Sequence, residues 1–154
     1  MVTSNVVAAA GHTILPLHDS AQTRAYWPIA KGTHMDLYQT NMRRVNLLLM
    51  GSDGVVEDAL NRLTPDLAEP VRTWHPSDPL ELPAPSQAGT LILREVGALP
   101  PIDQRRLLQW LELSVGRVQV VSTSSSRLLT MVDIGRFHET LYYRLNVMSF
   151  DMTS

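Results

Sequence analysis

Residues 46–54 read Asn46-Leu47-Leu48-Leu49-Met50-Gly51-Ser52-Asp53-Gly54, a short apolar run that ends in a glycine turn. A run without polar alternation is typical of a strand that is buried on both faces of a parallel sheet. In the residues that follow, Val56, Leu60 and Leu63 share one helical face, and Pro65 ends the pattern. The stretch therefore predicts a strand, a turn and then a helix over residues 55–63.

Apolar strands and helical segments alternate through the rest of the chain. Residues 75–86 carry four prolines, which remove backbone donors and predict a surface loop or linker. The alternation predicts the α/β class, with a parallel sheet of about five strands between two helical layers and the strand-to-helix turns along one edge. We expect the further strands at residues 71–74, 90–96, 118–121 and 146–152, and helices at 35–44, at 138–145 and after the Pro100-Pro101 pair.

On this pattern the chain divides into two parts. Residues 1–40 show no clear period and predict an irregular N-terminal arm, with one short strand near residues 13–15. Residues 41–154 are expected to form the α/β domain.

The composition excludes several classes of function. Thirteen Lys and Arg residues against fifteen Asp and Glu residues give a formal charge of -2, so no overall basic field attracts nucleic acid or a membrane surface. The chain has no cysteine, which excludes disulfides, Cys-ligated zinc and thiol catalysis. The apolar stretch Val6 to Gly11 is too short to span a bilayer and lacks the charged start of a signal peptide. We therefore expect a cytoplasmic protein with no membrane contact and no direct DNA binding.

The strand, glycine turn and helix form the setting of a phosphate-binding loop, in which backbone N–H groups and a lysine hold phosphate. Here Glu57 occupies the position of that lysine and Val56 that of the last glycine, while Asp53 and Asp58 add further negative charge. A carboxylate about 4 Å from a phosphate oxygen opposes binding by roughly 4 kcal/mol per charge pair. Two interpretations remain open: a plain strand–turn–helix whose acids stabilise the helix start, or the remnant of a nucleotide site.

Other groupings of polar residues give weaker signals. The serine-rich stretch at residues 122–126, with His138, lacks the spacing of a nucleophile elbow. His12, His18 and His34 match no metal-ligand spacing. We expect neither a serine nucleophile nor a metal site.

Two longer segments carry a family resemblance. Residues 89–100 (GTLILREVGALP) resemble the Walker B strand and the turn after it in the AAA+ domain of bacterial sigma-54-dependent transcription activators. Residues 135–147 (GRFHETLYYRLNV) are similar to the arginine-finger segment of the same family. Residues 47–51 fit the strand before Walker A, and residues 118–125 fit the sensor I strand.

The resemblance, which runs from residue 45 to 150, implies a P-loop NTPase (AAA+)-like fold. In that family a ring of subunits hydrolyses ATP to remodel the sigma-54 RNA polymerase complex. The loop that contacts sigma-54 in the family is missing between Walker A and Walker B, and the hairpin before sensor I is shortened to residues 114–117. The chain also stops at Ser154, so we expect no helical lid.

Residue by residue, most of the family's machinery is replaced. Glu57 stands at the Walker A lysine position, and Arg94 at the Walker B aspartate position. Glu95 keeps the catalytic glutamate, while Ser125 takes the place of the sensor I asparagine. The resemblance thus implies a nucleotide-binding remnant made of Gly51, Ser52, Asp53, Gly54, Glu57, Arg94, Glu95 and Ser125.

Two residues correspond to the family's finger arginines. His138 replaces the first finger arginine and Arg144 matches the second. Arginine fingers act between subunits, so the resemblance implies an inter-subunit role for this region.

The two inverted charges suggest a direct contact. In an active site of this kind, the lysine and the aspartate flank phosphate and magnesium from neighbouring strand ends. We predict that Glu57 and Arg94 pair across the empty cradle, because each would otherwise be an unpaired charge there. The alternative is two solvated charges on separate loops.

These observations favour a non-catalytic AAA+-like domain that acts through protein contacts in bacterial transcription regulation or signalling. We expect no cofactor, and a protein partner that is either a second copy of the chain or a related AAA+ regulator. The alternative is an ATP-binding sigma-54-type regulator ATPase with a rearranged site, which would use ATP and magnesium and retain Glu95 and Arg144. Enzymatic activity remains open between the two, and the chain could also be one module of a longer regulator.

Overall fold

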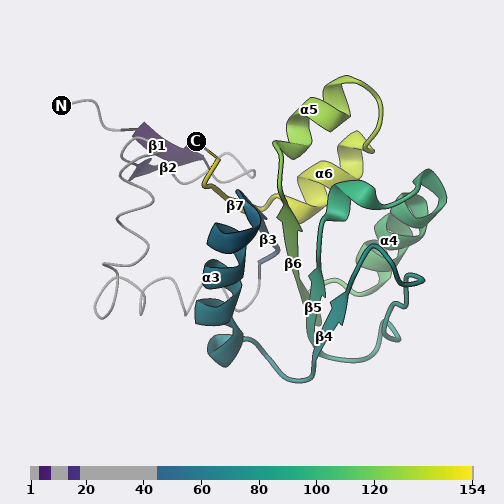
Figure 1. Cartoon of the computed structure of the whole chain (residues 1–154). Coiled ribbons are helices and arrows are strands. Elements are labelled where there is room, and N and C mark those ends of the chain that lie inside the picture. Colours follow the sequence, from purple (N-terminus) through teal and green to yellow (C-terminus); the bar gives the residue numbers. More distant parts are fainter. Residues whose placement is uncertain (1–3, 8–13, 18–44, 154) are drawn as a thin grey trace.

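The computed structural model describes residues 4–7, 14–17 and 45–153 (Figure 1). Its central element is a five-stranded sheet in the order β4-β5-β6-β3-β7, in which all neighbouring strands are parallel. The predicted α/β class and parallel sheet are confirmed. The strands are β3 (Leu47–Met50), β4 (Val71–Trp74), β5 (Gly89–Leu93), β6 (Val118–Ser124) and β7 (Met148–Asp151).

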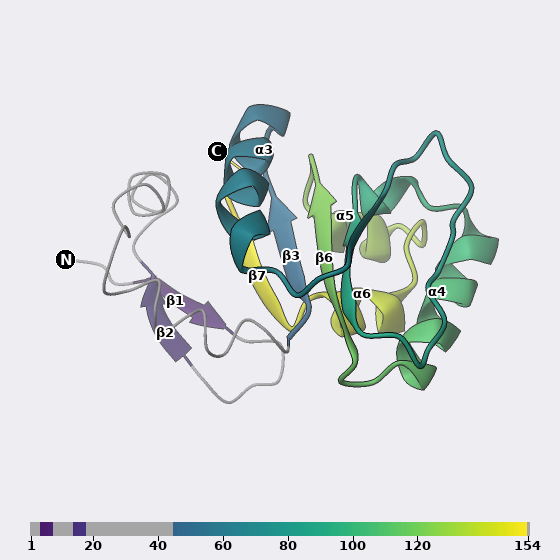
Figure 2. The same cartoon turned by 90° about the horizontal axis from the view of Figure 1, so that it is seen from below.

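Helices cover both faces of this sheet (Figures 1 and 2). Alternate residues of β3 face opposite sides: Leu47 and Leu49 pack in the core beneath α3, and Leu48 and Met50 pack in the core on the other face. Because β3 is buried on both sides, its sequence has no polar alternation. The helices are α3 (Asp53–Leu63) on one face and α4 (Pro101–Leu113), α5 (Leu128–Asp133) and α6 (Glu139–Leu145) on the other, with 3-10 turns η1 (Thr64–Asp66) and η2 (Val96–Ala98).

Several boundaries differ from the sequence predictions, and those of β5 and β6 have a clear structural reason. Strand β7 is also shorter than the predicted 146–152. Helix α3 begins at Asp53, two residues earlier than predicted, and Val56 and Leu60 are buried on one helical face, as predicted. Strand β5 ends at Leu93 rather than at residue 96, because the chain leaves the sheet at Glu95 with a left-handed φ of 46°. Strand β6 continues to Ser124, since its backbone pairs with β3 as far as Met50↔Ser124 despite the polar side chains.

Helix α5 was not predicted. Its signals are present in the sequence, since apolar Leu128 and Met131 lie three residues apart and Gly135 follows the helix with a positive φ of 74°. A glycine with positive φ just after a helix is a common way to end it.

Near the N-terminus, β1 (Ser4–Val7) and β2 (Ile14–Leu17) form an antiparallel pair. Strand β2 lies close to the short strand predicted near residues 13–15, whereas β1 was not predicted and corrects the expectation of an irregular arm at those residues. The predicted helix at 35–44 lies outside the described residues, as do His12, His18 and His34. The domain division at residue 40 remains a prediction.

The proline-rich segment after β4 is held against the domain by two indole groups. Trp74 Nε1 donates to the carbonyl of Asp78 at 2.9 Å, and Trp110 Nε1 donates to the carbonyl of Pro83 at 2.6 Å. Leu80, between these two points, is buried. We call residues 75–88 the strap, since it is a surface loop anchored on the α4 side of the sheet rather than a free linker.

In residues 4–7, 14–17 and 45–153, no helix combines the length and the apolar character of a membrane span.

Candidate functional site

The residues of the predicted nucleotide remnant gather where β3, β5 and β6 end. Gly51 and Ser52 follow β3, Arg94 and Glu95 follow β5, and Ser125 follows β6. The carboxyl ends of parallel strands share one edge of a sheet, and such edges are the usual binding sites of this fold class. The tertiary structure therefore brings this part of the predicted site together.

An ion pair crosses the site. Arg94 Nη2 lies 2.6 Å from Glu57 Oε2, and the two side chains are 25% and 50% exposed. This short distance is typical of a charge-assisted hydrogen bond. The predicted pairing of Glu57 with Arg94 is confirmed, and the alternative of two separately solvated charges is wrong.

Arg94 and Glu57 meet because of two local features. The backbone of Arg94 is fixed at the end of β5 by a hydrogen bond from its N–H to the carbonyl of Trp74 at 3.0 Å. Glu57 projects from the early part of α3, which is separated from β3 by only two residues. Each charge neutralises the other at the position where the resemblance implies phosphate and magnesium.

The loop after β3 is short. The predicted turn over residues 51–54 reduces to Gly51 and Ser52, since α3 begins at Asp53. The N–H of Gly51 donates to the carbonyl of Ser124, and the N–H of Val56 donates to that of Ser52, both at 3.0 Å. These two amides are therefore already bonded to the protein's own backbone.

The start of α3 carries an acidic residue. Asp53 lies in its first turn, where a carboxylate complements the positive end of the helix dipole. Val56, at the position of the family's last loop glycine, is buried beneath the helix. A side chain now fills space that a glycine would leave open.

The end of β7 packs directly over Gly51. The N–H of Met152 donates to the carbonyl of Met50 at 2.7 Å, and Met152 is buried. A Cβ placed on Gly51 would lie 3.1 Å from Met152 Cβ. Sequence reasoning missed this contact, because nothing near either residue in the chain indicates that they meet.

Glu95 is held in one orientation by the end of β6. Its N–H donates to Thr123 Oγ1 at 3.0 Å, and its Oε2 accepts from Ser125 N at 3.2 Å and Ser125 Oγ at 3.0 Å. A left-handed conformation at a residue other than glycine costs on the order of 1–3 kcal/mol, which these contacts offset. The residues at the catalytic-glutamate and sensor I positions thus bind each other, and Thr123, missed by sequence reasoning, supports them.

The finger region is separate from this site. His138 precedes α6 and Arg144 lies in its last turn, so the two are about 9 Å apart along the helix axis. The carbonyl of Arg144 accepts from Asn46 Nδ2 at 2.9 Å, and Arg144 lines a cavity of about 190 Å³ with Asn46, which precedes β3, and Val118, which begins β6. Arg144 therefore lies at the amino edge of the sheet, opposite Arg94. The structure brings neither finger residue to the nucleotide remnant of its own chain.

A buried glutamine fixes the segment before α6. Gln104 Nε2 donates to the carbonyls of Leu99 at 2.9 Å and Arg136 at 3.1 Å. Its Oε1 accepts from the N–H of His138 at 2.8 Å. Sequence reasoning missed Gln104, whose position within an otherwise helical pattern gave no signal.

Within the described ranges, no group of three or more His, Asp or Glu side chains is placed to hold a metal ion.

The comparisons with known proteins agree with this geometry. Residues 31–154 match the family described as the sigma-54 interaction domain. Among curated relatives, the transcriptional regulatory protein ZraR of Klebsiella oxytoca is 37% identical over 79 residues, which are 44% of this chain and 18% of the relative. The acetoin catabolism regulatory protein of Cupriavidus necator is 40% identical over 78 residues, 44% of this chain and 12% of the relative. The matched stretch thus spans less than a fifth of either relative.

Solved structures show the same fold. The P-loop NTPase domain of a sigma-54 activator from E. coli aligns with a TM-score of 0.50 at 17% identity, covering 71% of this chain and 99% of that chain. NtrX from Brucella abortus in complex with ADP aligns with a TM-score of 0.57 at 18% identity, covering 87% of this chain and 39% of that chain. Since the family match covers 31–154 of the 154 residues, this chain belongs to the sigma-54 interaction domain family and has its P-loop NTPase fold.

Proposed function

We propose that this domain is a non-catalytic member of the sigma-54 interaction family that acts through protein contacts in bacterial transcription regulation. The observation that carries the proposal is the Arg94–Glu57 ion pair, 2.6 Å long, at the two positions where the family has a lysine and an aspartate. With the pair formed, neither charge is free for phosphate or magnesium.

Three further features oppose nucleotide binding. A triphosphate at the start of α3 would have to separate Glu57 from Arg94, and the released carboxylate would oppose a phosphate oxygen about 4 Å away by roughly 4 kcal/mol per charge pair. The amides of Gly51 and Val56 have backbone acceptors already. Met152 is buried over Gly51.

Titration with ATP and magnesium, by calorimetry or with a fluorescent analogue, tests the proposal. We expect no binding tighter than about 0.1 mM, or roughly -5.5 kcal/mol. Tighter binding by the unmodified chain would overturn the proposal and favour the alternative, an ATP-binding regulator that uses Glu95 and Arg144.

A matched pair of variants tests whether the charge of Glu57, rather than the shape of the loop, limits nucleotide affinity. Glu57→Ala removes the acid and frees the Arg94 guanidinium, so its affinity for triphosphate should rise at least about tenfold, or 1.4 kcal/mol. Arg94→Ala leaves an unpaired carboxylate, so its affinity should not rise. Equal affinities of the two variants would contradict the role given to the ion pair.

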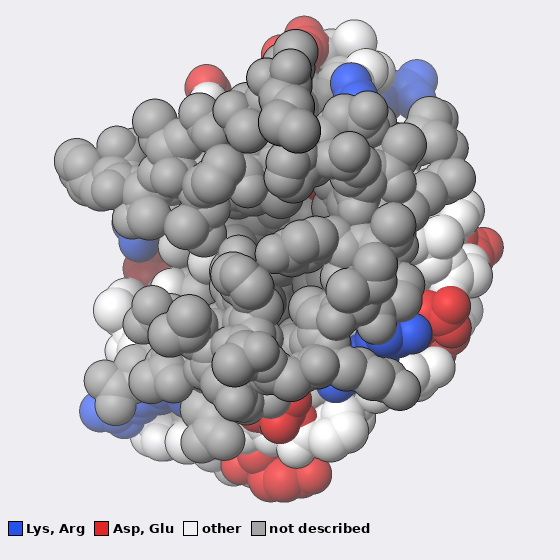
Figure 3. All heavy atoms as spheres, turned by 90° about the vertical axis from the view of Figure 1, so that its left-hand side faces the viewer, with Lys and Arg blue, Asp and Glu red and all other residues white. Residues whose placement is uncertain are grey.

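The partner is then a protein, either a second copy of this chain or a related AAA+ regulator, and we propose neither a cofactor nor direct DNA contact. On the face in Figure 3, the basic and acidic side chains of described residues that can be seen lie around the margin, near one another. A cytoplasmic location and a role as one module of a longer regulator belong to the same proposal.

A further inference from the structure

One edge of the sheet is open. In the part of the chain that the structure describes, β4 is an end strand that pairs only with β5. The carbonyls of Pro70 and Trp74 accept from the N–H groups of Thr90 and Arg94, both at 3.0 Å, so these peptide groups point toward β5. Because successive residues of a strand alternate in direction, the N–H and C=O of Thr73 point away from the sheet.

The other outward residue of this edge is already partly satisfied. The N–H of Val71 donates to Glu69 Oε2 at 3.3 Å. Thr73 is therefore the position at which β4 offers both a free donor and a free acceptor. Edge strands with such free groups are templates for pairing with another chain.

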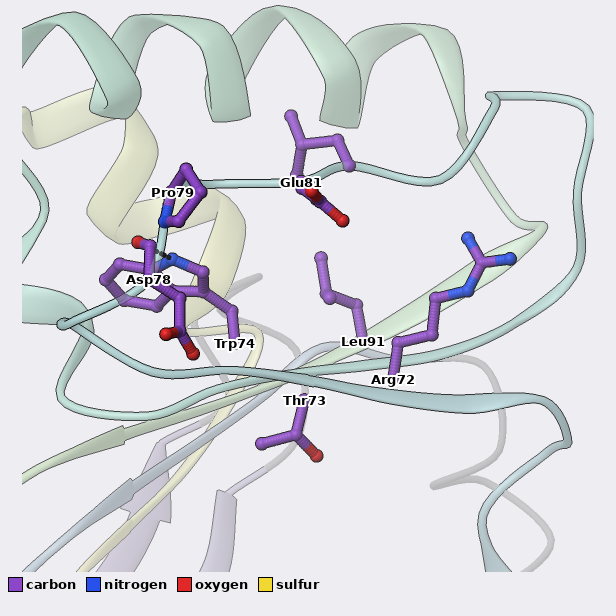
Figure 4. Close-up of a pocket in the computed structure, with 8 residues that line it drawn as sticks. Arg72, Thr73, Trp74, Asp78, Pro79, Glu81 and Leu91 are labelled. Atoms are coloured by element: carbon purple, nitrogen blue, oxygen red, sulfur yellow. Dashed lines mark hydrogen bonds between the residues drawn. The ribbon is translucent and has the colours of Figure 1, made fainter.

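A groove of about 780 Å³ runs along this edge, between β4 and the strap (Figure 4). Figure 4 shows Arg72, Trp74 and Leu91 on the strap side of the sheet, while the Thr73 side chain points to the opposite side. Leu91 and Trp74 lie at the base of the groove and are almost fully covered, with 1% and 5% of their surface exposed. The groove is thus formed by a buried apolar base beside an open backbone edge.

The charged side chains along the groove differ in sign from one end to the other. Arg72 lies toward the start of β4, whereas Asp78 lies at its Trp74 end, where its carbonyl accepts from Trp74 Nε1. Glu81 lies on the strap between them (Figure 4). None of these three charged side chains has an ion-pair partner among the described residues.

We propose that a second copy of this chain docks here, with the two β4 edges antiparallel about a two-fold axis at Thr73. The two Thr73 backbones would then exchange a pair of hydrogen bonds and extend the sheet across both copies. The two-fold axis reverses the direction of β4, which brings Arg72 of each copy toward Asp78 and Glu81 of the other. A surface with opposite charges at its two ends is self-complementary in this arrangement, as an isologous interface requires.

A second copy fits the groove better than an unrelated strand, because the observed charges supply both halves of each contact. The interface is small, so we expect a weak dimer with a dissociation constant on the order of 10 µM. The proposal adds a partner surface to the proposed function, but it involves no residue of the nucleotide remnant.

Analytical ultracentrifugation of the full chain over a range of concentrations, without nucleotide, tests the proposal. Thr73→Pro should weaken dimerisation at least about tenfold, since it removes the outward donor without taking a hydrogen bond from β5. Its melting temperature should stay within a few degrees of that of the unmodified chain. A chain that remains monomeric at about 0.5 mM, or a dimer unaffected by Thr73→Pro, would overturn the proposal.

Charge reversal provides a second test that does not depend on backbone changes. R72E alone and D78R/E81R alone should each be monomeric, because like charges then face each other at both contacts. An equal mixture of the two should form a heterodimer at least about tenfold tighter than either homodimer, since both contacts become attractive. Failure of the mixture to associate would contradict the two-fold arrangement. Glu57→Ala should dimerise like the unmodified chain, so this proposal and the proposed function can fail separately.

Discussion

Gly51 and Met152 lie against each other, so that a Cβ on Gly51 would come within 3.1 Å of Met152 Cβ. The two residues are at opposite ends of the domain sequence, and the pairing of β3 with β7 brings them together. The glycine that directly follows β3 therefore has a packing role. Gly54, the second glycine of the predicted turn, has no neighbouring atom within 4 Å of an added Cβ.

The two glycines should respond oppositely to the same substitution. Gly51→Ala should lower the free energy of unfolding by about 1–3 kcal/mol, because the new methyl group overpacks against Met152. Gly54→Ala should raise it by up to about 1 kcal/mol, because Gly54 lies inside α3 and alanine favours a helix. Urea unfolding of both variants checks this prediction. A stable Gly51→Ala variant would show that Met152 does not occupy the space above the loop.

The ion pair between Glu57 and Arg94 should contribute modestly to stability. Its side chains are 50% and 25% exposed, and solvent weakens such pairs. A double-mutant cycle with Glu57→Ala and Arg94→Ala should give a coupling energy of about 0.5–1 kcal/mol, reduced by salt. A coupling energy indistinguishable from zero at low salt would contradict a stabilising role for the pair.

The indole of Trp110 should be important for the anchored strap. Trp110→Phe removes the hydrogen bond to the carbonyl of Pro83, 2.6 Å long and buried. The free energy of unfolding should fall by about 1–3 kcal/mol, because the carbonyl of Pro83 is left without a donor. Trp74→Phe is the matched comparison. Its acceptor, the carbonyl of Asp78, belongs to a partly buried bond, so water can replace the indole and the loss should be smaller. Thermal unfolding of both variants checks this prediction. A larger loss of stability in Trp74→Phe than in Trp110→Phe would contradict it.

Ionisation of Tyr142 should lower the free energy of unfolding at high pH. Burial raises the pKa of its hydroxyl above the ordinary value of 10.0, and a hydrogen bond from Asn146 opposes this only in part. Below pH 10 both the folded and the unfolded chain hold the proton, so the contribution of Tyr142 is fully present. As the pH rises further, the unfolded chain loses the proton first, and stability falls until the folded-state pKa is passed. Urea unfolding between about pH 9 and pH 11 should show this fall, and Tyr142→Phe should reduce it. An identical fall in the Tyr142→Phe variant would assign the effect to other groups.

Most strands and helices of this domain could be predicted from sequence, because each depends on residues close together in the chain. The apolar run at Leu47–Met50 indicates a strand buried on both faces, and the prolines before α4 indicate the start of a helix. The Glu57–Arg94 contact was also predictable, since two inverted charges at neighbouring strand ends stabilise each other.

What the sequence by itself determined is therefore the order of the five parallel strands and of helices α3, α4 and α6, the family, and the changed charge of the loop after β3. Only the tertiary structure decided that Met152 covers Gly51, that Thr123 and Ser125 orient Glu95, and that Arg144 lies at the opposite edge of the sheet from Arg94. Strand and helix propensities are local, whereas these contacts depend on strand register and on which strands become neighbours. The same register leaves Thr73 of β4 facing outward, which no pattern in the residues around it reveals.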